Sequence, residues 1–462
     1  MAIPLITYPY ITRTLSVNSL GLVNFSSSIV NYFILLAGMG YSTYAIREGA
    51  KCREDKEKFQ VFANEVFSMN IITMISSLLL LFIVVFISKS NYVIYTILSL
   101  QIVFSTIGQD WINTVYEEFV YITGRTILFQ ICSVLFLFLF VKNPDDIIGY
   151  SFFIVFATIG ANIANYFYIK NFCNLRFTIH IKYKNHIKPI LLLFFSSVAS
   201  TIYTNLDVTM LGIIKGDYQV GIYSTSLKIY NMIKQMVIAF IFVYEPRITN
   251  SLYASDGKYS ALAKDLIEKL FMFIIPTICG TVLLSKDIIY LLAGAKYAGS
   301  ANVLVVLSIG LVFPILAYFY MHIFIIPYQK ELNLVICSMT GAFADAILNS
   351  VLIPHFGTIG AAVSTVIAEM FVMVFAIGFS YKARIKLLGI KYIVQLILGA
   401  FGMSCSIILL QRSIDNLLLR LLICTLVGGI IYIVLLLIER NNQVIGMAKF
   451  IKVKITKGEK YE

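Results

Sequence analysis

Apolar stretches of about 20 residues recur along the whole length of this 462-residue chain, separated by polar connectors. A helix of that length crosses a hydrocarbon core of ~30 Å, and it satisfies its own backbone hydrogen bonds where no water is present. Hydrophobic residues make up 59% of the chain and charged residues 13%, against roughly 25% charged in soluble domains. The sequence therefore predicts an all-α integral membrane protein.

We expect about fourteen transmembrane helices, of which the first is too short to cross the membrane. In chain order the predicted spans are 1–12, 19–43, 67–87, 92–112, 119–141, 147–169, 189–213, 220–246, 265–285, 301–327, 332–353, 358–380, 392–410 and 417–438. The longest connectors are 44–66, 170–188 and 247–264. Each is too short to hold a core of its own, which excludes an extracytoplasmic enzyme domain.

Lys and Arg are distributed unevenly between alternate connectors. The set that contains 44–66 and the C-terminal tail holds 24 of the 36 basic residues, whereas the other set holds seven. Because short cytoplasmic loops carry an excess of Lys and Arg, both termini are expected to be cytoplasmic. In so apolar a chain, the net charge of +12 indicates this orientation signal and contact with anionic lipid, not nucleic-acid binding.

An internal repeat relates the two halves of the chain. Gly21 with Phe25, Ser26, Ser28, Ile29 and Tyr32 recurs as Gly221 with Tyr223, Ser224, Ser226, Leu227 and Tyr230, at an offset of 198 to 200 residues. Six spans lie between the copies, which predicts two six-helix lobes around a central cavity. The expected domains are 1–187 with helices 1–6, 188–380 with helices 7–12, and 381–462 with helices 13 and 14 and a basic cytoplasmic tail.

The same repeat bears on the start of the chain. The seventh span begins near residue 189, some 32 residues before Gly221, while Gly21 has only 20 residues ahead of it. The first helix is therefore expected to lack about a dozen residues at its N-terminal end. A genuine half-helix is the alternative, and the cost of lipid-facing backbone disfavours it.

Signatures of catalysis or metal binding are missing from the sequence. There is no Walker loop, HExxH, GxSxG or acidic pair at helical metal spacing, so we expect neither an enzyme nor a cofactor. The seven cysteines are scattered without a CxxC and are interpreted as packing residues, outside any disulfide or metal site. The four histidines lack ligand spacing and are expected in loops or at the membrane interface.

Ionisable residues inside the spans cost ~2.5–3.5 kcal/mol each on insertion scales, which makes each one a functional candidate. Arg13, Arg47, Glu245 and Arg247 lie at span ends, where Arg47 and Arg247 are expected to snorkel to water. The residues inside spans are Asp110, Arg125, Asp207, Lys228, Lys234, Asp345 and Glu369.

Two neighbouring spans each carry a polar face. In the seventh span it comprises Ser196, Ser200, Tyr203 and Asp207. In the eighth it comprises Tyr223, Ser224, Lys228, Tyr230, Asn231, Lys234 and Gln235, within about 160° of arc. A hydrogen-bonded helix seam would explain the Ser and Tyr residues but not two lysines. Two ammonium groups on one face suit a phosphate or diphosphate, so we predict a water-filled cavity that binds an anion.

The acidic residues leave two roles open. Asp207 either binds a coupling proton or sodium ion, or neutralises Lys228 or Arg125, and neutralisation is slightly favoured. Asp110, Asp345 and Glu369 share these alternatives. If the acidic residues bind a coupling ion, the energy source is an H+ or Na+ gradient. ATP is not expected because the sequence has no Walker loop.

Several stretches, in order along the chain, carry a resemblance to a known family. They are Tyr8 to Leu15, Gly40 to Glu48, Asp110 to Arg125, Phe140 to Asp146, Tyr203 to Gly212, Gly221 to Lys228, Pro246 with Arg247, and Gly357 to Glu369. They resemble the Wzx-type oligosaccharide flippases of the multidrug/oligosaccharidyl-lipid/polysaccharide (MOP) exporter superfamily. The opening Pro9-Tyr10-Ile11-Thr12-Arg13 looks like the family's Pro-Tyr-x-Ser/Thr-Arg signature. Thr114-Val115 and Val120 depart from the Gln-Gly and Lys that the family often shows.

The resemblance implies fourteen helices in two lobes around a cationic cavity. It also implies export of undecaprenyl-diphosphate-linked repeat units to the outer leaflet for capsule, O-antigen or related polysaccharide, with membrane lipids and the polysaccharide polymerase machinery as expected contacts. Arg13, Arg125 and Lys228 match family positions, whereas Lys234 is inferred from the helical face. The expected substrate-binding residues are Arg13, Arg125, Tyr203, Lys228, Tyr230, Asn231 and Lys234.

Two alternatives are weaker. A cation-coupled multidrug exporter of the same fold would require an acidic cavity, and the predicted cavity is basic. A membrane-embedded polysaccharide polymerase or ligase would usually carry a sizeable outward loop, and the longest outward connector here is 286–300.

Overall fold

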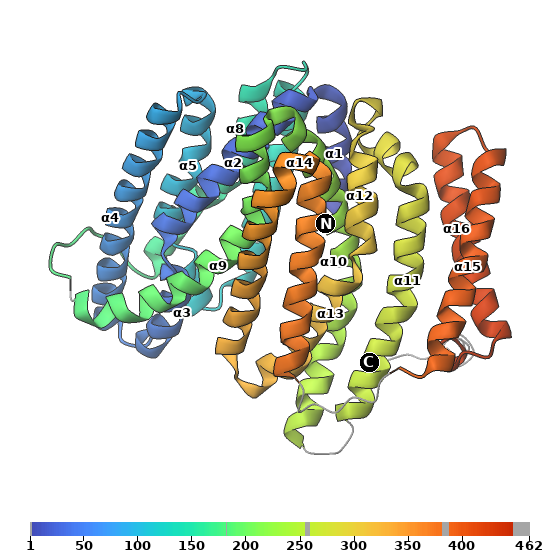
Figure 1. Cartoon of the computed structure of the whole chain (residues 1–462). Helices are drawn as coiled ribbons and strands as arrows, with labels where there is room; N and C mark the ends of the chain where they lie inside the picture. Colours follow the sequence, from blue (N-terminus) through green and yellow to red (C-terminus); the bar gives the residue numbers. More distant parts are fainter. Residues whose placement is uncertain (1, 182, 255–258, 381–387, 447–462) are drawn as a thin grey trace. The chain divides into compact units, whose positions relative to one another are not determined.

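The computed structural model describes residues 2–181, 183–254, 259–380 and 388–446, except for ten or so side chains, most of them in 183–199. Every regular element in these ranges is helical (Figure 1). The chain is therefore an all-α protein, as the apolar stretches predict.

Each predicted span corresponds to a helix. The first eight are α1 (Ala2–Thr14), α2 (Val17–Gly38), α4 (Lys56–Ser88), α5 (Tyr92–Gly108), α7 (Phe119–Phe140), α8 (Ile147–Tyr168), α9 (Tyr183–Lys215) and α10 (Asp217–Ala254). The others are α11 (Tyr259–Leu292), α12 (Ser300–Ile309) with α13 (Val312–Tyr320), α14 (Glu331–Phe379), α15 (Ile390–Ser413) and α16 (Leu417–Ile438).

Ten helices of the described ranges are long and apolar enough to cross a membrane, or eleven if α12 and α13, bent by 42°, form one span. The remaining predicted spans are the short α1, α9 with its partly undescribed side chains, and the second part of α14. Gly357 divides α14, because its φ of 57° and ψ of −129° are not helical. Glycine alone adopts such angles at little cost.

The connectors are more helical than the hydropathy pattern indicates. Within 44–66 the chain forms α3 (Tyr41–Cys52), and α4 already begins at Lys56, capped by Asp55, which accepts a hydrogen bond from the Lys58 amide. A short α6 (Trp111–Val115) follows α5. Polar turns of this kind are stable in water, so helices continue past the apolar residues that hydropathy detects.

The helices form two compact units. One comprises Met1–Ser224 with Asn349–Gly357, and the other comprises Thr225–Leu348 with Thr358–Glu462. In the first unit, α5 packs on α8 and α2 packs on α4 and α9. In the second, α15 and α16 lie side by side and pack on α11. The division into 1–187, 188–380 and 381–462 stays a prediction.

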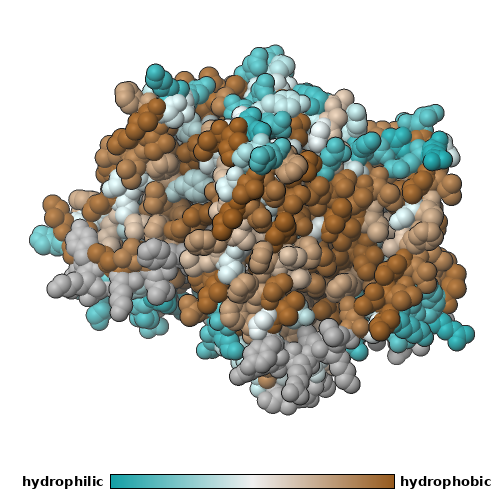
Figure 2. All heavy atoms as spheres, in the orientation of Figure 1, coloured by the Kyte–Doolittle hydropathy of each residue, from teal (hydrophilic) through white to brown (hydrophobic). Residues whose placement is uncertain are grey.

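Apolar side chains cover the flanks of α15 and α16, with hydrophilic ones at both helix ends (Figure 2). Leu409, Leu426 and Ile438 are each more than 60% exposed. In water such a surface would be strongly unfavourable, whereas acyl chains solvate it. This is the distribution of a multi-pass membrane protein.

The two glycines of the internal repeat contact each other's helices inside the first unit. A Cβ built on Gly21 of α2 would lie 1.8 Å from the carbonyl oxygen of Asp217, and one on Gly221 of α10 would lie 2.3 Å from that of Val17. Asp217 is four positions before Gly221, and Val17 is four positions before Gly21, so the two contacts are equivalent. This reciprocity is the mark of a local two-fold axis, and it supports the repeat.

Candidate functional site

Lys228 and Lys234 lie on α10 in the second unit, in different environments. The Lys234 ammonium is 3.5 Å from a carboxylate oxygen of Glu369 on α14 and 5.1 Å from the centre of the Tyr230 ring. Lys228 is exposed, and no acidic side chain of the described residues lies within ion-pair distance of it. Tyr230 is buried and Asn231 is half-buried. Glu369 thus partly neutralises Lys234, while no acidic side chain of the described residues does so for Lys228.

Arg125 of α7 belongs to a polar network of the first unit. Its Nη2 donates to Asp110 Oδ1 over 2.8 Å, and the same oxygen accepts from Asn165 Nδ2 of α8 over 2.9 Å. The Arg125 side chain is 4% exposed and that of Asp110 is 53% exposed. Arg125 Nε and Nη1 are buried and have no hydrogen-bond acceptor in the described part of the chain. Asp110 reaches this position because the helix breaks after Gly108, where Gln109 has a φ of 46°.

Asp207 is buried in α9 and accepts hydrogen bonds from two neutral groups. The Tyr223 hydroxyl donates to Oδ2 over 2.5 Å, and the Asn349 amide donates to Oδ1 over 2.6 Å. Arg125, one of its two expected cationic partners, pairs with Asp110. The role of Asp207 stays a prediction. Asn349 was missed by the sequence reasoning, and its only signal is an amide within an apolar span.

The other candidates lie on α1, α9 and α14. Arg13 is exposed at the end of α1, and with Tyr10, Lys142 and Pro144 it lines a cavity of about 610 Å³ in the first unit. Tyr203 is half-buried on α9, and Asp345 is buried on α14. The Ser196 side chain lies outside the described residues.

Part of the polar surface of α9 forms a helix seam with α2. Thr209 shares hydrogen bonds with the hydroxyls of Ser28 and Tyr32, and Asn205 accepts one from Asn31. A hydrogen-bonded seam therefore lies beside the predicted polar face of α9.

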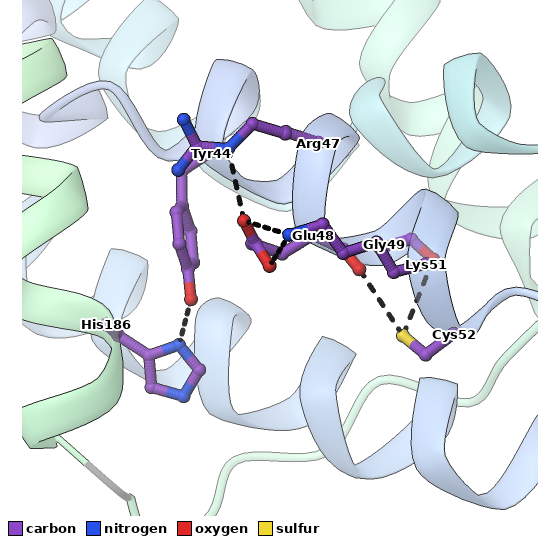
Figure 3. Close-up of polar contacts among 7 residues, drawn as sticks. All are labelled: Tyr44, Arg47, Glu48, Gly49, Lys51, Cys52 and His186. Carbon is purple, nitrogen blue, oxygen red and sulfur yellow. Dashed lines mark hydrogen bonds and ion pairs between the residues drawn. The ribbon is translucent and has the colours of Figure 1, made fainter.

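A buried polar triad was not expected from the sequence. The Tyr44 hydroxyl lies 2.6 Å from His186 Nδ1, and His186 Nε2 lies 2.7 Å from Glu65 Oε2. All three residues are at most 6% exposed. His186 lies in a helix and not in a loop, whereas its predicted place at the membrane interface stays a prediction. Figure 3 shows the Tyr44–His186 contact beside α3, where Arg47 and Lys51 both pair with Glu48. Glu65 was assigned to a connector, and only its place on the extended α4 brings it to His186.

A wide apolar cavity of about 630 Å³ lies between helices of the second unit. Its wall comes from α10, α11, α15 and α16 and includes Met236, Phe273, Gly280, Gly429 and Tyr432. The lining is almost wholly apolar, so the cavity fits a hydrocarbon chain rather than a sugar or a phosphate.

Comparisons with known proteins give a consistent result. The family model described as polysaccharide biosynthesis protein matches residues 1–252. A putative O-antigen transporter of Escherichia coli (strain K12) is 23% identical over 316 residues, which cover 66% of this chain and 75% of the relative. A putative O-antigen transporter of Shigella dysenteriae is 22% identical over 377 residues, which cover 80% of this chain and 94% of the relative.

Two solved structures share the fold. Lipid II flippase MurJ in an inward closed conformation has a TM-score of 0.70 at 18% identity, covering 92% of this chain and 97% of its own. An inward-facing multidrug resistance MATE family transporter of the MOP superfamily has a TM-score of 0.59 at 13% identity, covering 82% and 94%. The family match covers more than half of the sequence, and it agrees with the resemblance to Wzx-type flippases. The chain belongs to the polysaccharide biosynthesis protein family, and it is a multi-pass membrane protein that shares its fold with these transporters.

Proposed function

We propose that this transporter flips undecaprenyl-diphosphate-linked oligosaccharide repeat units from the inner to the outer leaflet by alternating access, for the synthesis of a surface polysaccharide. The observation that carries the proposal is Lys228, a lysine within a membrane span that no acidic side chain of the described residues neutralises. A lone ammonium there costs several kcal/mol unless water or an anion solvates it.

Arg125 supports the same kind of ligand. It is buried with two N–H-bearing nitrogens that have no acceptor in the described part of the chain. Since buried donors are nearly always satisfied, the two nitrogens call for an acceptor from outside the protein, such as water or a phosphate oxygen. A guanidinium also matches the geometry of a phosphate group.

The substrate proposed here has a long hydrocarbon chain as well as a charged head. The apolar cavity between α10, α11, α15 and α16 offers such a chain a dry surface next to lipid. In this scheme the diphosphate is held by Lys228, Lys234, Arg125 and Arg13, and the sugars occupy the water-filled space. Tyr203, Tyr230 and Asn231 are proposed to contact the sugars.

Further parts of the proposal follow from charge. The bias of Lys and Arg supports an inner-membrane protein with both termini cytoplasmic. Asp207, Asp110, Asp345 and Glu369 are proposed either to bind a coupling proton or sodium ion or to neutralise cations of the site. Contact with the polysaccharide polymerase machinery belongs to the same proposal, and the chain's own role in it is not catalytic.

The experiment compares transport by variants of the purified protein in vesicles with a fluorescent undecaprenyl-diphosphate oligosaccharide. Lys228→Ala with Lys234→Ala should lower the flipping rate by at least tenfold, since a hydrogen bond to a charged group contributes about 1.5–3 kcal/mol. The control is Lys56→Ala, exposed at the start of α4, which should flip like the unaltered protein. Equal rates for the double variant and the control would contradict the proposal, as would export of a cationic drug with no flipping of the lipid.

A further inference from the structure

The connector between α8 and α9 is held against α4 by a regular set of hydrogen bonds. Gln60 pairs with both backbone groups of Asn174, at 2.8 and 2.6 Å. Asn64 Oδ1 accepts from the Arg176 amide at 2.9 Å, and Ser68 Oγ accepts from the Thr178 amide at 2.8 Å. The three α4 residues are four positions apart and share one helix face, while the three amides alternate along extended backbone. The connector is therefore positioned by the fold.

This connector forms one side of a polar cavity of about 280 Å³ at the end of α8. Its basic side chains are Lys170 and Arg176, both exposed, and neither lies within ion-pair distance of an acidic side chain of the described residues. The Lys170 ammonium lies over the rings of Tyr166 and Phe167, 5.1 and 5.0 Å from their centres. The lining residues are Tyr166, Ile169, Lys170, Cys173, Asn174, Leu175 and Arg176, and none is acidic.

The cysteine in this lining does not compensate the charge. Burial raises the pKa of the Cys173 thiol to about 12, so the group is neutral at physiological pH and is a poor nucleophile. The cavity therefore carries two uncompensated positive charges, and they attract an anion.

Exposed apolar residues lie next to the lining residues in the sequence. Phe167 is 62% exposed, Phe177 is 54% exposed and Ile179 is 82% exposed. Such side chains are stable at the boundary between lipid headgroups and acyl chains, where aromatic and basic residues gather. A free anion in solution would make no use of them, whereas a phospholipid offers a phosphate for the cations and chains for the apolar side chains.

We propose that this cavity is a binding site for the phosphate headgroup of an anionic phospholipid, such as phosphatidylglycerol, with Lys170 and Arg176 contacting the phosphate. Phe177 and Ile179 lie against its acyl chains. The site is independent of the proposed transport residues on α7 and α10, so either proposal can fail without the other.

Native mass spectrometry of the detergent-purified protein, with added phosphatidylglycerol or phosphatidylcholine, measures the affinity. Phosphatidylglycerol should bind more tightly than phosphatidylcholine. Each basic residue near the membrane surface contributes about 1 kcal/mol to the binding of an anionic lipid. Since 1.4 kcal/mol is a tenfold change in affinity, Lys170→Ala with Arg176→Ala should weaken phosphatidylglycerol binding about 30-fold. The control is Lys286→Ala with Arg412→Ala, two exposed basic residues of the second unit, and its affinity should not change.

Three results would overturn the proposal. The first is equal affinity of the unaltered protein for the two lipids, a measurement that does not depend on whether any variant folds. The second is a pair of observations that would indicate a site for any anion: millimolar inorganic phosphate displaces the lipid, and the double variant Phe177→Ala with Ile179→Ala binds the lipid as tightly as the unaltered protein. The third is that undecaprenyl diphosphate competes with phosphatidylglycerol for the unaltered protein, and that this competition is lost in the double variant Lys170→Ala with Arg176→Ala. That result would assign the cavity to the transport substrate.

Discussion

The crossing of α2 and α10 at Gly21 and Gly221 allows a quantitative test. A methyl group on Gly21 would lie 1.8 Å from the Asp217 carbonyl oxygen, whereas ordinary contacts begin at 3.4 Å. The obstacle is backbone, so no side chain can rotate away and the two helices must separate. Overpacking typically costs about 1–3 kcal/mol, and a backbone obstacle places Gly21→Ala at the upper end, near 3 kcal/mol.

The same geometry predicts that the two substitutions are not additive. Gly221→Ala places its methyl 2.3 Å from the Val17 carbonyl oxygen, at the same crossing. Once one methyl group has separated the helices, the second meets less resistance. The double variant should therefore be destabilised about as much as the worse single variant, well short of the sum.

The assay is the temperature at which the protein leaves the monodisperse peak in size-exclusion chromatography after heating in detergent. Unfolding of such a protein is irreversible, so variants are compared at one heating rate. A loss of ~3 kcal/mol corresponds to roughly 5 °C or more in a unit of this size. Gly38→Ala, in the same helix but with no atom within 4 Å of the new Cβ, is the matched control and should keep the original midpoint. A midpoint for Gly21→Ala equal to that of Gly38→Ala would refute the close crossing.

Three further predictions concern the second half of α14, the apolar cavity and the buried triad. Gly357→Ala should destabilise by about 1–3 kcal/mol through its backbone angles alone, since nothing lies within 4 Å of the new Cβ, and Gly378→Ala, equally open but without a positive φ, should be neutral in the same heating assay. Gly429→Leu should fill part of the apolar cavity without a clash at Cβ and slow lipid flipping, whereas Gly429→Ala should not; equal rates for both would remove the cavity from the lipid path. Glu65→Ala should cost about 1–3 kcal/mol because it leaves a buried ring nitrogen of His186 without its hydrogen-bond partner, and expression in the membrane at the normal level with the normal melting temperature would show that the triad does not hold α4 to α9.

The positions of the apolar helices were predictable from the sequence because lipid imposes a simple rule. A stretch of about 20 apolar residues in a bilayer must be helical, and all predicted spans have a corresponding helix. The hydropathy pattern was less informative at helix ends. There α3 and the first turns of α4 are polar helix in water, and a capping residue such as Asp55 determines their start.

The candidate site was predictable only in part. That Arg125 and Lys228 are costly inside a span follows from their charge and position alone. Which of them is neutralised does not follow, because the partners come from distant segments. Lys234 meets Glu369, Arg125 meets Asp110, and Lys228 meets no carboxylate among the described residues.

The sequence by itself determined that this chain spans a membrane, where its apolar helices lie and which charges they carry, since each of these depends on the local run of side chains and the solvent. Only the tertiary structure decided that His186 is buried against Glu65, that Gly21 and Gly221 lie at one crossing, and that Lys170 and Arg176 share a cavity. Contacts of that kind depend on how helices pack, and packing selects partners by shape and distance, which no local pattern of residues records.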